Sequence, residues 1–166
     1  MRRRKIIILF GFCLFVAMFF DFLPTVFYLN ITDSLPVGLY MKIPGKDYHR
    51  GDYIVYEPNE KTKTLMRQYG WDDGTHTFLK RVGGIAGDTY AIDETTLTFT
   101  VNDKYVGQVY VTDTARHHLP QIRGNFTVEE GQILPIAKNP RSFDGRYTGT
   151  IPLKQIKAKV IPILTK

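Results

Sequence analysis

The chain has 166 residues, with 22 basic and 16 acidic side chains and a single cysteine. Arg2 to Lys5 supply four of the basic side chains, so the rest of the chain carries 18 against 16 and is nearly neutral. This balance gives no support to nucleic-acid binding. Cys13 has no partner within the chain, which excludes internal disulfides and a thiolate metal site.

The first predicted element is a transmembrane helix. Residues 1–5 form a basic cytoplasmic segment, and residues 6–29 form an apolar signal anchor with no charge between Ile6 and Phe20. As a helix, residues 6–23 would span about 27 Å, close to the hydrocarbon core of about 30 Å. Pro24 is expected to end or kink this helix.

The cations before the apolar segment orient the chain. They predict a single-pass protein of the cytoplasmic (inner) membrane whose remaining residues lie on the periplasmic side and contact membrane lipid. Two alternatives stay open, a cleaved secretory signal and a buried core helix. No small-x-small cleavage site follows the apolar core, which favours the uncleaved anchor.

A loop is predicted next, around Ser34, where the sequence reads Asn-Ile-Thr-Asp-Ser-Leu-Pro-Val-Gly. The chain has two serines against seventeen threonines, so a primary hydroxyl at this position is unusual. Ser34 follows the predicted membrane exit by about ten residues, which would hold its hydroxyl near the bilayer surface. An ordinary turn serine is the structural alternative.

Residues 30–166 are long enough for one domain, which we predict to be all-β and antiparallel. Short runs rich in β-branched and aromatic residues alternate with Gly and Asp turns, which is typical of strands. The predicted strands are residues 52–56, 77–82 (ending at Gly83-Gly84), 89–92, 97–101, 105–106, 108–111, 131–136 and 157–163. One weakly amphipathic helix is predicted over residues 61–69.

Lys80 lies in the predicted strand over residues 77–82. Alternation places Phe78, Lys80 and Val82 on one face, so the lysine would be flanked by apolar side chains. Burial disfavours an ammonium group and lowers its pKa toward neutrality, as a general base requires. A snorkelling lysine on a solvated strand edge is the alternative.

No metal or cofactor is expected. The histidines lack ligand spacing, and the glycines near Gly84 and Gly87 are not followed by the Gly-Lys-Ser/Thr of a phosphate loop.

In order along the chain come the apolar anchor, the Ser34 segment, Arg50-Gly51-Asp52-Tyr53-Ile54-Val55-Tyr56, Lys80-Arg81-Val82-Gly83-Gly84-Ile85-Ala86-Gly87-Asp88 and Ser142-Phe143-Asp144-Gly145-Arg146-Tyr147-Thr148-Gly149. Together these segments resemble the type I signal peptidase family of Ser–Lys endopeptidases. The Ser34 segment lacks the usual Ser-Met-x-Pro. Its pattern Asn30-x-Thr32-x-Ser34-x-Pro36-x-Gly38-x-Tyr40 instead resembles the conjugative-transfer branch, the TraF-like peptidases that process pilin precursors.

The resemblance implies a role for each matched residue. Ser34 would be the nucleophile and Lys80 the general base, with the Ser34 backbone N–H and the Thr32 hydroxyl forming the oxyanion hole. Ser142 would orient the lysine, and Asp144 and Arg146 would support the site. Gly145 departs from the family pattern, which often has serine at that place.

The resemblance therefore implies a membrane-anchored serine endopeptidase with a signal-peptidase-like β domain. Its substrate would be a pilin precursor or another preprotein, released as a linear or a cyclised product. Its expected partners are this substrate, membrane lipid and components of a conjugation or type IV secretion assembly. The alternatives are a housekeeping signal peptidase and a non-enzymatic envelope β domain of such an assembly.

Overall fold

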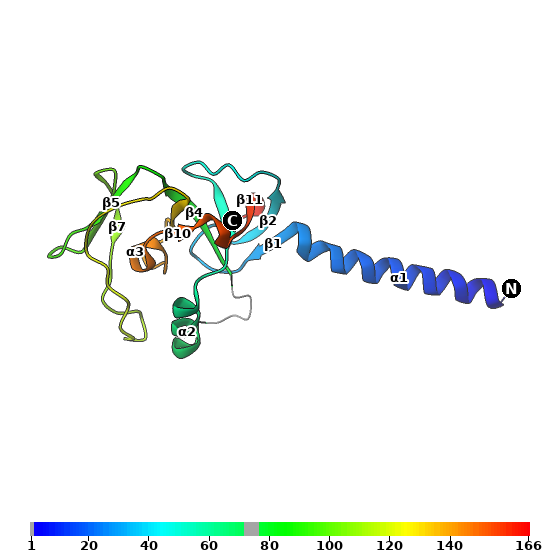
Figure 1. The fold of residues 1–166 in the computed structure, drawn as a ribbon. Helices are drawn as coiled ribbons and strands as arrows, with labels where there is room; N and C mark the ends of the chain where they lie inside the picture. Colours follow the sequence, from blue (N-terminus) through cyan, green and yellow to red (C-terminus); the bar gives the residue numbers. More distant parts are fainter. Residues whose placement is uncertain (1, 72–76) are drawn as a thin grey trace.

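A computed structural model describes residues 2–71 and 77–166 and consists of a long N-terminal helix followed by two β-sheets (Figure 1). The helices are α1 (Arg2–Val26), α2 (Glu60–Tyr69), the one-turn α3 (Gly145–Thr148) and the 3₁₀ turn Leu153–Gln155. The strands are β1 (Phe27–Asn30), β2 (Gly38–Ile43), β3 (Tyr53–Tyr56), β4 (Phe78–Ile85), β5 (Thr89–Ile92), β6 (Thr98–Val101), β7 (Lys104–Gln108), β8 (Gly124–Thr127), β9 (Gln132–Ile136), β10 (Ile151–Pro152) and β11 (Ile156–Thr165).

The described strands pair only in the antiparallel sense, which confirms the predicted strand arrangement. The larger sheet has the order β1-β2-β11-β3-β4-β9-β10, and the smaller sheet has the order β7-β6-β5-β8. β4 lies between β3 and β9 in the larger sheet, and a short turn connects it to β5 in the smaller one. The chain therefore passes from the larger sheet to the smaller one after β4 and returns to the larger sheet between β8 and β9.

The alternation predicted for β4 is confirmed, because Lys80 and Val82 are buried while Arg81 is exposed. The predicted end of this strand is wrong, since β4 runs through Gly83 and Gly84 to Ile85 with a register shift against β9. A Cβ at Gly83 would come within 2.5 Å of the Ile136 side chain. The glycine is therefore required by the close approach of two strands and does not mark a turn.

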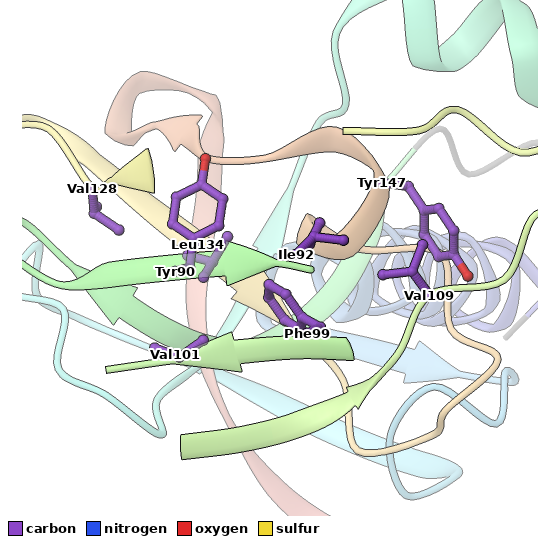
Figure 2. Close-up of a cluster of buried hydrophobic side chains, with 8 residues drawn as sticks. All are labelled: Tyr90, Ile92, Phe99, Val101, Val109, Val128, Leu134 and Tyr147. Carbon is purple, nitrogen blue, oxygen red and sulfur yellow. The ribbon is translucent and has the colours of Figure 1, made fainter. Parts of the chain in front are cut away.

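Three clusters of buried apolar side chains form the core. The largest cluster joins the smaller sheet to β9 of the larger one and to α3 (Figure 2). It consists of Tyr90, Ile92, Phe99, Val101, Val109, Val128, Leu134 and Tyr147. Because Tyr147 belongs to this cluster, the segment that carries Ser142, Asp144 and Arg146 is packed against a rigid part of the molecule.

The N-terminal helix projects away from the sheets (Figure 1). It passes Pro24 and ends at Val26, so the proline does not end it, and the predicted 29/30 boundary falls inside β1. Many of its apolar side chains are exposed: Ile7, Ile8, Leu9, Phe10, Phe12, Leu14 and Met18. Judged on the described residues alone, no helix has both the length and the apolar character of a membrane span. The membrane anchor therefore stays a prediction.

The other elements are partly as predicted. α2 confirms the helix expected over residues 61–69, and Asn59 caps it by accepting a hydrogen bond from the Thr62 N–H at 2.9 Å. A strand over residues 108–111 is wrong, because β7 ends at Gln108 and Val109 turns into the core. β1, β2, β8, β10, α3 and the 3₁₀ turn Leu153–Gln155 were not predicted.

Candidate active site

The structure brings Ser34 and Lys80 together, although they come from different elements. Ser34 lies in the loop between β1 and β2, and Lys80 lies on β4. Lys80 Nζ is 2.6 Å from Ser34 Oγ and 2.9 Å from Ser142 Oγ, and the two hydroxyl oxygens are 3.1 Å apart. Each of the three polar groups is therefore within hydrogen-bond distance of the other two.

Lys80 is buried, with 4 % of its surface exposed, which rules out the snorkelling alternative. Its neighbour across the sheet is the buried Ile54, and its Nζ lies 5.4 Å from the centre of the Phe78 ring. Burial lowers the pKa of Lys80 from 10.5 to about 8; Asp144 opposes this effect and Arg146 adds to it. An amine with this pKa is uncharged in a substantial fraction of molecules near neutral pH.

Asn30 determines the shape of the Ser34 loop. Its buried amide donates hydrogen bonds to the carbonyl oxygens of Thr32, Leu35 and Pro36, at 3.0, 3.0 and 3.1 Å. The loop is thus held from inside at positions on both sides of Ser34. The sequence pattern contained Asn30 but did not reveal this role, since the contact depends on the loop closing around the side chain.

Two further residues of the same pattern support this loop. Tyr40 is fully buried, and its hydroxyl donates to the Pro36 carbonyl at 2.8 Å. Gly38 has φ +144°, and a Cβ there would lie 2.0 Å from the Leu164 carbonyl oxygen of β11. Only glycine permits this conformation and this contact. The spacing of the motif therefore has a structural cause at Asn30, Pro36, Gly38 and Tyr40.

Thr32 is exposed, and its hydroxyl is engaged in this structure. Because the Asn30 amide nitrogen donates to three carbonyl groups, its Oδ1 is the acceptor, and the Thr32 hydroxyl donates to it at 2.9 Å. To donate to an oxyanion, the Thr32 hydroxyl would have to rotate away from Asn30. The oxyanion role of Thr32 stays a prediction.

Asp144 and Arg146 form a buried ion pair with 0 % and 1 % of their side chains exposed. Two hydrogen bonds connect them, from Arg146 Nε and Nη2 to the two carboxylate oxygens, at 2.9 and 2.8 Å. The guanidinium also donates to the carbonyl oxygens of Ala137, Asn139 and Pro140, and the carboxylate accepts from the Ala137 N–H. The pair therefore fixes the segment that leads to Ser142.

Gly145 lies between the members of this pair. A Cβ there would come within 2.6 Å of the Pro135 carbonyl oxygen and 2.7 Å of Leu134 Cδ1. This close approach to β9 explains why glycine stands where the family often has serine. The Asp144–Arg146 pair keeps its geometry without a side chain between its members.

Ser34 and Lys80 line a cavity of about 750 Å³. Its walls come from β1, from the end of α2, and from the loop after β7. Most of the lining is apolar or aromatic, including Leu29, Val55, Met66, Trp71, Phe78, Leu79, Phe143 and Tyr147. A hydroxyl next to a partly deprotonated amine, at the edge of an apolar cavity, has the composition of a site for nucleophilic attack on a bound chain.

A protein-family model matches nearly the whole chain. The family model described as "Signal peptidase, peptidase S26" matches residues 2–164. The chain therefore belongs to the peptidase S26 family of signal peptidases, which are serine peptidases.

Within this family, two curated relatives are both described as "Plasmid transfer protein TraF" from Escherichia coli. They are 26 % and 27 % identical to this chain over 146 residues, which is 82 % of this chain and 82 % of each relative. A signal peptidase I from Enterococcus faecalis V583 aligns with a TM-score of 0.39 and 18 % identity, over 68 % of this chain and 96 % of its own.

Proposed function

We propose that the protein is a membrane-anchored serine endopeptidase that uses Ser34 and Lys80 as a catalytic dyad. The observation that carries this proposal is the distance of 2.6 Å between Ser34 Oγ and a buried Lys80 amine whose pKa is lowered to about 8. At pH 7.5 about a quarter of such amines are uncharged, compared with about one in a thousand at the ordinary pKa. The fold therefore supplies the base that a serine nucleophile needs.

The chemistry follows from the three contacts at Lys80. Ser34 Oγ attacks the scissile carbonyl carbon while its proton passes to Lys80 Nζ, and the ammonium then protonates the leaving amine. The Ser142 hydroxyl, at 2.9 Å, keeps the amine pointed at Ser34 during both transfers. The resulting ester on Ser34 reacts either with water, which gives a linear product, or with the substrate's own amine, which gives a cyclic one.

The oxyanion of the tetrahedral intermediate is assigned to two donors. The Ser34 backbone N–H is the first, and the Thr32 hydroxyl, released from Asn30, is the second. Asp144 and Arg146 act indirectly, because their hydrogen bonds go to each other and to the 137–140 backbone. They hold the segment before Ser142 in place.

The membrane location rests on the first 26 residues and on the surface beside them. Four cations precede an uncharged apolar run, and the described side chains of that run are largely exposed on a helix that projects from the domain (Figure 1). Three further apolar side chains are exposed: Leu29 in β1, Ile31 directly after it, and Leu164 near the end of β11. We assign this surface to the periplasmic face of the inner membrane, in contact with lipid.

The proposed substrate is a pilin precursor or similar preprotein of a conjugation or secretion system. Support comes from the two plasmid transfer proteins TraF among the relatives and from the Asn30-to-Tyr40 pattern. A peptidase beside the bilayer reaches peptide bonds near a substrate's own membrane segment. A housekeeping signal peptidase would share the chemistry and differ in substrate.

The test is to express the full chain and its Ser34→Ala and Lys80→Ala variants with the candidate precursor in cells. Each variant is expected to lose all detectable conversion of precursor to product on a gel while remaining folded by circular dichroism. Mass spectrometry of the product made by the unsubstituted chain distinguishes hydrolysis from cyclisation, because a cyclic product is one water lighter than the trimmed linear form. Normal processing by either variant would favour a non-enzymatic envelope protein.

A further inference from the structure

Arg141 is a cation in the wall of the Ser34 cavity that the proposed reaction does not use. It precedes Ser142 directly, and its side chain is exposed. Among the residues that the structure describes, no carboxylate pairs with its guanidinium group. Its partner is the Tyr110 ring, with the guanidinium carbon 5.0 Å from the ring centre.

The position of Arg141 is fixed from both sides of the cavity. Its backbone N–H donates to Asn139 Oδ1 at 2.8 Å, and the Asn139 amide donates to the Asp33 carbonyl at 3.1 Å, next to Ser34. The Tyr110 N–H donates to the Tyr147 hydroxyl at 3.1 Å. The guanidinium is thus held between the nucleophile loop and the segment after β7, with its N–H groups available to a ligand.

The other charged groups of the cavity wall are already engaged. Asp113 is bonded to His117, through Oδ2 to the ring Nδ1 at 2.8 Å and through Oδ1 to the backbone N–H at 2.8 Å. Lys80 is occupied with the two serines. Arg141 is therefore the charged group of the cavity wall that no described polar side chain engages, and its guanidinium is open to a bound anion.

We propose that Arg141 binds a carboxylate of the chain held in the Ser34 cavity, either an acidic side chain close to the scissile bond or a terminal carboxylate. This inference rests on the proposed function only in taking that chain as a substrate. A planar guanidinium with free N–H groups pairs with a carboxylate in a two-pronged geometry, which gives direction as well as attraction. Arg141 would then be a positioning residue that selects substrates and sets their register.

The experiment measures binding separately from turnover. The full chain carrying Ser34→Ala, in detergent micelles, is titrated with fluorescent synthetic peptides built from small and apolar residues. The peptides differ only in Glu or Gln at successive positions, and each is made with a C-terminal acid or amide, so that the two carboxylate sources are compared. At low salt we expect one Glu peptide, or the free-acid series, to bind about tenfold more tightly than its neutral counterpart.

Arg141→Gln is expected to abolish this preference, and Arg141→Glu to favour a Lys peptide instead. Arg123→Gln is the matched control, because Arg123 is an exposed arginine outside the cavity lining, bonded to the Glu94 carbonyl. Equal binding of all peptides, or a preference that survives Arg141→Gln, would overturn the inference. A preference for carboxylate without any Ser34-dependent cleavage by the unsubstituted chain would instead remove the peptidase assignment and leave this site standing.

Discussion

Lys80 is the residue on which the proposed chemistry depends, and its protonation sets the expected pH dependence. The amine is a base only when uncharged, and burial brings its pKa to about 8. Single-turnover acylation of the full chain should therefore rise with pH through about 8 and level off above it. A rate that is flat between pH 6 and 9, measured with an acylating probe on Ser34, would contradict a lysine base with this pKa.

The same burial affects stability, and the sign follows from the two pKa values. The folded-state pKa of Lys80 lies below its ordinary 10.5, so the unfolded chain binds more protons between pH 8 and 10.5. Stability therefore rises with pH across this window, and the cost of the buried ammonium is fully present below it. The proposed general base is thus a residue whose burial lowers the stability of the fold near neutral pH.

At the scale of elements, the Ser34 loop is held by side chains of the two strands that flank it. Asn30 ends β1 and Tyr40 lies in β2, and both bond to loop carbonyl oxygens. These contacts position Ser34, the proposed nucleophile. A substitution that removes one of them should therefore displace Ser34 even if both strands stay paired.

Asn30→Ala tests this dependence. We expect turnover to fall at least about tenfold, because three loop carbonyl groups lose the amide group that donates to them and the serine hydroxyl loses its alignment with Lys80. The loss in unfolding free energy is expected to be about 1–3 kcal/mol. Turnover and urea unfolding are measured in parallel, with Asn125→Ala as an exposed control on β8. Unchanged turnover would show that the loop keeps its shape without Asn30.

The elements also show how far the sequence could be interpreted. Alternation within β4 was sufficient to predict that Lys80 shares a face with Phe78 and Val82, because residues two apart in a strand lie on one face whatever the strand pairs with. It did not decide between a buried lysine and one that reaches solvent at a strand edge. Contacts between distant segments could not be predicted in this way. The β1 strand continues the apolar run of the helix with no composition change, and Gly83 resembles a turn until the Ile136 side chain beside it is known.

The candidate site was likewise predicted only in part. Motif resemblance brought Ser34, Lys80 and Ser142 into one prediction, and the structure places all three in mutual contact. The resemblance gave no reason to single out Arg141 or Asn139. Their roles depend on contacts with Tyr110 and Asp33, which are distant in sequence. Contacts between loops that are distant in sequence can be identified only from the folded structure.

For the whole molecule, Asp88 connects the two sheets. It lies in the turn between β4 and β5, and it accepts hydrogen bonds from the Arg50 guanidinium, the Ile85 N–H at 2.8 Å and the Asn102 amide at 2.8 Å. These donors come from the loop before β3, from β4 itself and from the β6–β7 turn. The hydrogen bond from Arg50 is the main cause that lowers the pKa of Asp88 below its ordinary range.

Asp88→Ala should therefore weaken the contact between the sheets. We expect a loss of about 1–3 kcal/mol in unfolding free energy, because the hydrogen bonds to the buried Asp88 carboxylate are lost, while the exposed Arg50 and Asn102 side chains regain water. Urea unfolding at pH 7 measures this loss, and Asp47→Ala, an exposed carboxylate, serves as the control. Since the folded-state pKa is depressed, the contribution of Asp88 is present above pH 4 and disappears as the pH falls further. Equal unfolding free energies for Asp88→Ala and Asp47→Ala would show that Asp88 does not stabilise the contact between the two sheets.

The contact of Gly38 with β11 has a consequence for biosynthesis. Gly38 pairs with Thr165, and the Lys166 N–H donates to the Val37 carbonyl at 3.0 Å, so the loop that carries Ser34 is completed by β11, which follows it far along the sequence. During synthesis Ser34 therefore emerges before the strand that supports its loop.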